Sequence, residues 1–198
     1  MDRFKFLLSA IGNCLKSNNW KKQGKTFYFS QDNNWGLINF QNSTDNQEEI
    51  LFTINLAVSS TVLRKFEDKD LTKMPGIVRC HWTERIGFLM PVNKDFWWEI
   101  DATTDLLALS REIIEILVQK GIPEIKKHMS DHALIAHWIR GESKGLTDFQ
   151  RMVNLVILLK HEHHPLLIDY IKELENIAAV DPIARYYLKE LDIRYGNR

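Results

Sequence analysis

The sequence predicts an α+β protein with a five-stranded antiparallel sheet, an N-terminal helix and a following helix on one face of it, and a helical C-terminal extension. Three observations predict this fold. Apolar residues recur at helical spacing near the N-terminus, and they alternate with polar residues between about residues 25 and 100. From Thr103 onward the period returns to about three and a half residues.

The first segment predicts an amphipathic helix that ends at Asn18-Asn19. Its apolar stripe has the i, i+3, i+4, i+7 spacing and consists of Phe4, Leu7, Leu8, Ile11 and Leu15. Two β-prone runs, KTFYFS and WGLINFQ, are joined by the turn-forming QDNN, which predicts a hairpin. In the next run, ILFTINLAVS, every second residue is apolar, as in a half-buried antiparallel strand.

The stretch VRCHWTERIGFLMPVNKDFWWEI, residues 78–100, supplies the last two predicted strands. Successive side chains of a strand point to opposite faces, so Cys80 and Trp82 should share the apolar face. Because Cys80 and His81 would then point apart, they do not form a thiolate–imidazolium pair. The opposite, outward face should carry Arg79, His81, Thr83 and Arg85, with Trp97 from the last strand.

The C-terminal half predicts a series of helices. One helix should stop at Gly121, and the next should run from Pro123 to Arg140. Later helices should begin at a capping box of Thr147 and Gln150, at Pro165, and at Pro182 after an Asp181 N-cap. We therefore expect an α+β domain over residues 1–121 and a helical extension over residues 122–198 that packs on it.

The composition excludes several classes of function. Lys+Arg and Asp+Glu each total 26, so the chain lacks the basic surplus typical of nucleic-acid-binding proteins. No apolar run is long enough to span a membrane, and the N-terminus does not resemble a signal peptide. The two cysteines, Cys14 and Cys80, are expected to be buried thiols in a reducing compartment. We therefore expect a cytoplasmic protein without nucleic-acid or membrane partners.

The motifs predict neither a cofactor nor a metal site, and no catalytic residue. Phosphate-binding glycine loops and paired cysteines are missing from the sequence. His161, His163 and His164 fit the C-terminal end of a helix, where they offset the dipole. His128 and His132 have chelating spacing but lack the HExxH pattern, because Met129 follows His128.

The outward face of the sheet is the predicted binding surface. Its candidate residues are Asn55, Arg79, His81, Arg85 and Trp97. Hydrogen-bonding groups, arginines and an exposed aromatic are suited to recognition. Two other interpretations stay open: the face is simply solvated, as is common for antiparallel sheets, or the C-terminal helices cover it.

Several motifs carry a family resemblance. WKKQGKTFYF, NWGLINFQNS, FTINLAV, CHWTERIGFLMP and WWEI, in this order, resemble the bacterial family catalogued as domain of unknown function 4304. The resemblance covers about residues 3–120, and the later helices extend beyond it. It implies a compact unit of helices and strands with no assigned activity and no established catalytic residues.

The preferred hypothesis is a non-catalytic binding module that recognises a protein partner, for example as an immunity-like or accessory protein. The alternative is a small-ligand binder or an enzyme that acts on an anionic substrate, with Arg79, His81 and Arg85 supplying charge and a titratable group. A third hypothesis is a homo-oligomer held by the apolar helices. An enclosed pocket at His81 with a nearby carboxylate would favour the enzyme, whereas a flat exposed patch would favour a protein partner.

Overall fold

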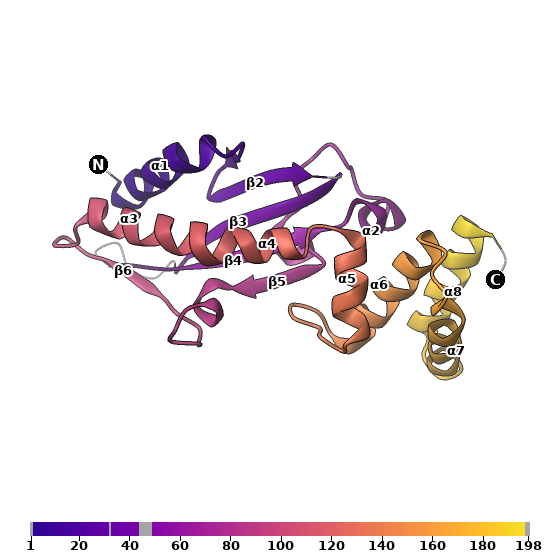
Figure 1. Ribbon diagram of the computed structural model, residues 1–198. Helices are drawn as coiled ribbons and strands as arrows, with labels where there is room; N and C mark the ends of the chain where they lie inside the picture. Colours follow the sequence, from indigo (N-terminus) through magenta and orange to yellow (C-terminus); the bar gives the residue numbers. More distant parts are fainter. Residues whose placement is uncertain (1, 32, 44–48, 197–198) are drawn as a thin grey trace.

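The computed structural model describes residues 2–31, 33–43 and 49–196. An antiparallel sheet is covered on one face by α1 and by the helical segment α3–α4 (Figure 1). Helices α5 to α8 follow at one end of the sheet (Figure 1). The architecture is therefore α+β, with helices at the N-terminus and after the strands, as the sequence predicts.

The strands are β1 (Lys21–Gln23), β2 (Thr26–Gln31), β3 (Asn34–Asn42), β4 (Ile50–Ser59), β5 (Trp82–Arg85) and β6 (Trp98–Ile100). The helices are α1 (Arg3–Lys16), α2 (Thr61–Phe66), α3 (Leu106–Ile116), α4 (Ile122–Lys127), α5 (Asp131–Ile139), α6 (Asp148–His161), α7 (Leu167–Ala178) and α8 (Pro182–Tyr195). The short strand β1 and the short helix α2 were not expected from the sequence.

The sheet runs β1-β2-β3-β4, and both β5 and β6 pair with β4. All the pairs are antiparallel. β5 pairs with residues 55–58 of β4, and β6 pairs with residues 50–52. The two short strands therefore share one edge of β4, and the loop between them stays beside the sheet.

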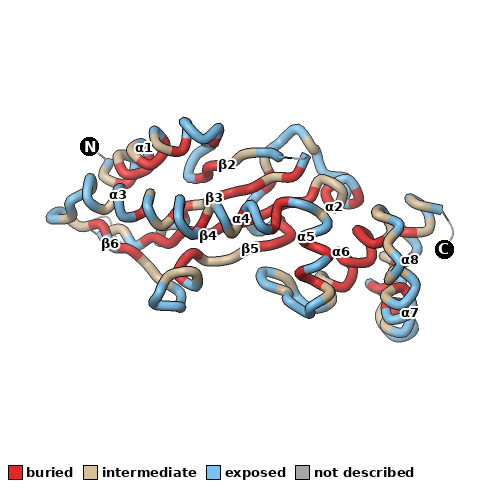
Figure 2. The backbone as a smooth tube through the Cα atoms, viewed as in Figure 1, coloured by how far each residue is buried: buried red, intermediate tan, exposed pale blue. Residues whose placement is uncertain are grey.

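The two-residue alternation in β4 is confirmed. Phe52, Ile54, Leu56 and Val58 are fully buried and pack in the main core with the apolar residues of α1. The tube of β4 is accordingly red along much of its length (Figure 2). The other face of the strand carries Thr53, Asn55 and Ala57, which face Gln41, Asn39 and Leu37 of β3. The face that is covered by helices is thus the apolar one, as expected.

The predicted alternation from Arg79 to Arg85 requires one continuous strand, and that prediction is wrong. Residues 77–79 and 86–89 form 3₁₀ turns, and only Trp82–Arg85 is a strand. Trp82 packs in the main core, whereas Cys80 packs with Leu37 and Ala57 in a small second cluster on the other face of the sheet. Strand alternation cannot be extended through a turn, which is why Cys80 does not share the Trp82 side.

The predicted break at Gly121 and Pro123 is also wrong. α3 continues through a π-helical turn, Leu117–Gly121, directly into α4. The N–H of Ile122 donates to the carbonyl of Leu117, five residues back. Such a turn rearranges the backbone hydrogen bonds just before Pro123, which has no N–H to donate. The helix predicted over 123–140 is instead two helices, since a new one begins after the Ser130 N-cap.

Other predicted helix starts agree with the structure. α6 begins with the complete capping box of Thr147 and Gln150, and α8 begins at Pro182 with Asp181 as its N-cap. α7 starts at Leu167, two residues after Pro165. α6 packs against α2, and α7 and α8 pack against α6 and against each other. None of the helices in the described ranges combines the length and hydropathy that a membrane-spanning segment needs.

Two buried histidines lie where α4, α5 and β5 meet. The His128 ring stacks on Trp82 with centroids 4.3 Å apart, and its centroid is 4.8 Å from that of His137. Nδ1 of His137 lies 3.0 Å from a carboxylate oxygen of Glu142. Burial lowers the pKa of both histidines; for His137, where the neighbouring His128 adds to the effect, the pKa falls to about 4.

These histidines predict a pH-dependent stability. Because an unfolded histidine has a pKa near 6.5, the unfolded state takes up protons before the folded state does. The free energy of unfolding should therefore fall as the pH is lowered from about 6.5 to about 4. Urea denaturation across this range measures the slope. His137→Gln should reduce the slope, because it removes a buried histidine whose pKa is lowered in the folded state.

Candidate functional site

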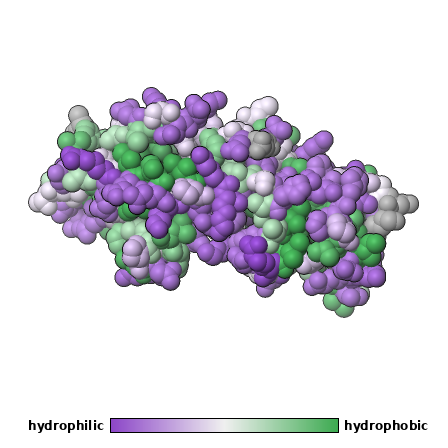
Figure 3. Space-filling model, in the orientation of Figure 1, coloured by the Kyte–Doolittle hydropathy of each residue, from purple (hydrophilic) through white to green (hydrophobic). Residues whose placement is uncertain are grey.

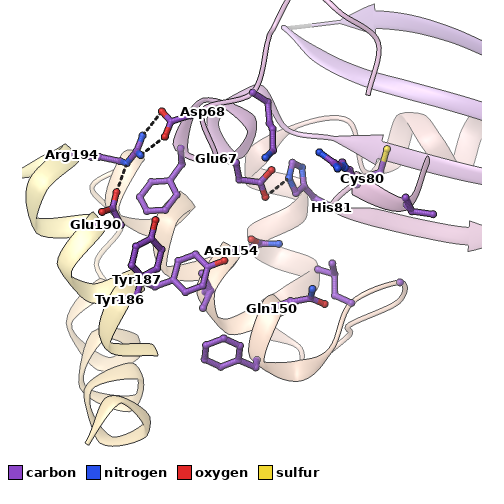
Figure 4. A pocket seen from close by; sticks show the side chains of 18 residues that line it. Glu67, Asp68, Cys80, His81, Gln150, Asn154, Tyr186, Tyr187, Glu190 and Arg194 are labelled. Carbon is purple, nitrogen blue, oxygen red and sulfur yellow. Dashed lines mark hydrogen bonds and ion pairs between the residues drawn. The ribbon is translucent and has the colours of Figure 1, made fainter. Parts of the chain in front are cut away.

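A cleft of about 600 Å³ lies between the end of α2, the segment before β5, and the helices α6 and α8 (Figure 4). Its lining consists of residues 66–69, 78–81 and 145–146, with Phe149, Gln150, Val153 and Asn154 of α6 and Tyr186, Tyr187, Glu190 and Arg194 of α8. The cleft is therefore built by the segments that connect β4 to β5 and by the C-terminal helices.

Arg194 fastens α8 to the residues that follow α2. Its guanidinium donates to both carboxylate oxygens of Asp68, at 2.9 and 2.6 Å, and to Glu190 at 3.1 Å (Figure 4). The guanidinium carbon also lies 5.0 Å from the centre of the Phe66 ring. Hydrogen bonding with Arg194 lowers the pKa of Asp68, as expected for a paired carboxylate. This bidentate contact links α8 to the opposite wall of the cleft.

We expect Arg194→Ala to loosen α8 without unfolding the sheet. The contacts are on the surface, so the melting temperature should change by no more than about 2–4 °C. Amide hydrogen exchange in residues 182–195 should become faster, while exchange in β3 and β4 should stay as it is in the wild type. Arg111→Ala, on α3, is the matched control. Unchanged exchange in α8 would show that Arg194 does not hold the helix.

Glu67 and His81 form an oriented pair in the cleft. The backbone N–H of Ser60 donates to Nδ1 of His81 at 2.9 Å, so the proton of the neutral ring is on Nε2. Nε2 faces a carboxylate oxygen of Glu67 at 3.6 Å (Figure 4). The His81 side chain is only 3% exposed, whereas that of Glu67 is 36% exposed. Glu67 is thus the member of the pair that a ligand can reach.

The pKa of Glu67 is lowered despite its environment. Partial burial acts to raise this pKa, but the neighbouring Nε2 side of His81, with the charges of Lys69 and Arg64, outweighs it. Burial of the ring, together with the charge of the same carboxylate, raises the pKa of Tyr187. The cleft therefore presents an ionised carboxylate beside a neutral tyrosine at neutral pH.

The geometry lacks an activated nucleophile among these residues. Burial raises the pKa of Cys80 to about 12, although the charge of Arg64 opposes this shift, so its thiol stays protonated. The Nδ1 lone pair of His81 is occupied by the Ser60 N–H. The enzyme hypothesis calls for an enclosed pocket at His81 with a nearby carboxylate. The carboxylate of Glu67 is present, but the pocket is an open cleft, and neither ring nitrogen of His81 is free to accept a proton from a ligand.

The structure divides the five predicted binding residues into two groups. Asn55 and Arg85 are paired across β4 and β5 on the outer face of the sheet, and the Arg85 guanidinium lies 5.4 Å from the centre of the Trp97 ring. Arg79 and His81 line the cleft instead. The expectation that all five share one face is wrong for Arg79 and His81, because the 3₁₀ turn at residues 77–79 interrupts the strand.

The outer-face group is largely satisfied by its own neighbours. Asn55 donates to Gln41 at 3.0 Å, and Asn39 donates to Thr26 at 2.9 Å. Arg85 forms an ion pair with Asp95. This leaves fewer unpaired groups for a ligand on the sheet than the sequence suggests.

Several cleft residues were missed by the sequence reasoning, chiefly Glu67, Tyr186, Tyr187 and Arg194. Glu67 lies in the charged segment between two strands, and the others lie more than 100 residues further along the chain. The adjacent tyrosines on a polar helix were the one local signal that could have pointed to them. Within the described ranges, no group of three or more His, Cys, Asp or Glu side chains could hold a metal ion.

A comparison with protein families shows where the chain matches a known family. The model of the domain of unknown function DUF4304 matches residues 11–134, so the match ends within α5. One wall of the cleft, residues 66–69 and 78–81, lies inside the match, and the wall from α6 and α8 lies beyond it. No curated protein and no solved structure matches the chain. Because the match covers more than half of its residues, the chain belongs to the DUF4304 family.

Proposed function

We propose that the protein is a non-catalytic binding module of the cytoplasm that recognises a protein partner through this cleft. The supporting observation is the distribution of exposed apolar side chains. Among the described residues, the six large hydrophobic side chains with the greatest exposure are Val78, Ile168, Val180, Ile183, Tyr186 and Ile193. Exposed apolar groups that gather in one region are typical of protein interfaces.

The position of two of these side chains connects the apolar surface with the cleft. Val78 is 91% exposed and Tyr186 is 57% exposed, and both line the cleft from different sides. The other four lie on or between α7 and α8, where hydrophobic residues are visible among hydrophilic ones (Figure 3). Apolar side chains at the edge of a polar cleft suit a partner that inserts a polar side chain into the cleft. The surface around that side chain would then cover the exposed apolar groups. The free thiols of Cys14 and Cys80 fit a reducing compartment.

A photo-crosslinking experiment tests this proposal. A benzophenone amino acid replaces Tyr186 in the full chain, and cells that naturally produce the protein are irradiated. We expect a discrete adduct with another protein, because a bound partner would cover the cleft rim. The same substitution at Val118, an exposed residue of the α3–α4 segment, is the control and should not give this adduct. The absence of a Tyr186-specific adduct would contradict the proposal.

Two other outcomes would support different functions. An adduct between two copies of the chain would indicate a homo-oligomer. Binding of a small anion is the second candidate, since Arg79 lines the cleft and has no ion-pair partner among the described residues. In that case Arg79→Ala would abolish anion binding, and no protein adduct would form at Tyr186.

A further inference from the structure

We propose that the cleft binds a basic side chain, lysine or arginine, of the protein partner. The cation would lie between the carboxylate of Glu67 and the aromatic rings of Tyr186, Tyr187 and Phe149. This inference rests on the proposed function, since it names the chemical group that the partner presents.

The first support is the state of Glu67. Nε2 of His81 faces one carboxylate oxygen of Glu67, Oε1. The lowered pKa of Glu67 keeps its carboxylate ionised. Oε2 has no hydrogen-bond or ion-pair partner among the described residues. His81 is in turn fixed by the Ser60 N–H. A carboxylate with one oxygen held by a neighbouring side chain and the other without a partner can accept hydrogen bonds from a cation.

The second support is the arrangement of aromatic rings. Tyr186 and Tyr187 meet edge to face with centroids 5.6 Å apart and planes at 72°. Phe149 of α6 meets Tyr187 in the same manner, at 6.3 Å and 63°. All three rings line the cleft. Rings at steep angles around one space present their electron-rich faces to a bound cation from more than one direction.

The Glu67 carboxylate and the aromatic rings line the same cleft. The charge of Glu67 adds to the burial that raises the pKa of the Tyr187 phenol. Figure 4 shows Glu67 above the cleft and the two tyrosines on its α8 side. Asn154 and Gln150, which also line the cleft, add amide oxygens that can accept hydrogen bonds. A basic side chain that enters here would meet acceptors and aromatic faces together.

The position of Glu67, rather than the net charge of the cleft, favours a cation over an anion beside the aromatic rings. Lys69 and Arg79 also line it, and Lys69 acts on the Glu67 carboxylate. The one buried donor, Nε2 of His81, is inaccessible and faces Glu67, so an anion approaching His81 would meet a negative charge first. Asp68 and Glu190 are already paired with Arg194. Of the other charged residues that line the cleft, Glu67, Lys69 and Arg79, Glu67 is the one whose charge acts on an aromatic residue of the site, Tyr187.

Capped tripeptides Gly-Arg-Gly, Gly-Lys-Gly and Gly-Glu-Gly are the probes for the test. Binding to the full chain is followed by NMR on the aromatic signals of Tyr186, Tyr187 and Phe149. We expect saturable shifts with the arginine and lysine peptides and none with the glutamate peptide. Glu67→Gln should weaken binding of the basic peptides about 3- to 10-fold, because it removes the charge and preserves the shape. Lys69→Met should strengthen it, because it removes a like charge.

A second variant separates binding from folding. Tyr186→Leu keeps an exposed apolar side chain but removes the ring, and it should also weaken binding of the basic peptides. Melting curves of all the variants verify that they are folded. The proposal is overturned if the glutamate peptide binds and the basic peptides do not, if Glu67→Gln strengthens binding, or if no peptide gives saturable shifts. A Tyr186 photo-crosslink to a partner protein could still form if these peptide experiments failed. The failure of this inference is therefore distinguishable from the failure of the proposed function.

Discussion

Replacing Trp82 with alanine is expected to reduce the free energy of unfolding by about 3–5 kcal/mol. Trp82 is 1% exposed and lies on β5 opposite Val58 of β4. Its ring stacks on His128 at the end of α4, with 14° between the planes. Alanine would leave a cavity at the place where the sheet meets the helices, and the surrounding backbone elements cannot all move in to fill it.

Trp82→Phe is the matched control, and chemical denaturation is the measurement. Nε1 of Trp82 has no hydrogen-bond partner among the described residues, so the loss of this N–H removes no bond there. Phenylalanine preserves a ring against His128, and its cost should be clearly smaller than that of alanine. A change of less than about 0.5 kcal/mol for Trp82→Ala would place this side chain outside the core.

Arg64→Ala should cost about 2–3 kcal/mol and should also alter the cleft. Arg64 is a buried residue of α2, and its Nη2 donates to the carbonyl oxygens of Asp70 and Lys73 at 2.6 and 2.8 Å. Its guanidinium carbon lies 5.7 Å from the centre of the Trp35 ring. The Arg64 side chain thus holds the segment of residues 70–73, which leads to Val78 and Arg79, against Trp35 of the sheet. Its loss would leave two carbonyls without their charged donor.

Denaturation and limited proteolysis measure this effect. We expect faster cleavage within residues 67–77 of the Arg64→Ala variant. Arg64→Lys should recover only part of the stability, because an ammonium group cannot reproduce the planar guanidinium over Trp35. Lys65→Ala is the neighbouring control at an exposed position. If Arg64→Ala were as stable and as resistant to protease as Lys65→Ala, the segment would be held by other contacts.

Much of the fold could be predicted because its signals are local. The alternation in β4 identifies the buried face, and the Thr147 capping box identifies the start of α6. The segment 77–89 was harder, since its turns interrupt a pattern that reads as one strand. Gly121 and Pro123 have strong helix-breaking tendencies, but packing of the helix on the sheet and the π-helical turn override them.

The candidate site was predicted only in part. Arg79 and His81 were identified from their residue types, although their predicted surface was the sheet and not the cleft. Glu67, Tyr186 and Tyr187 come together because α6 and α8 fold back beside α2, and this contact spans more than 100 residues. Local periodicity contains no information on such a distant pairing. The functional proposal therefore depends on tertiary structure to a greater extent than the fold does.

The most direct test combines the Tyr186 photo-crosslink with two single changes of charge. The adduct yield is compared among the otherwise wild-type chain, Glu67→Gln and Lys69→Met under identical irradiation. A partner that inserts a basic side chain predicts a lower yield with Glu67→Gln and a higher yield with Lys69→Met. Equal yields in all three chains, or changes of the opposite sign, would contradict recognition of a basic side chain in this cleft.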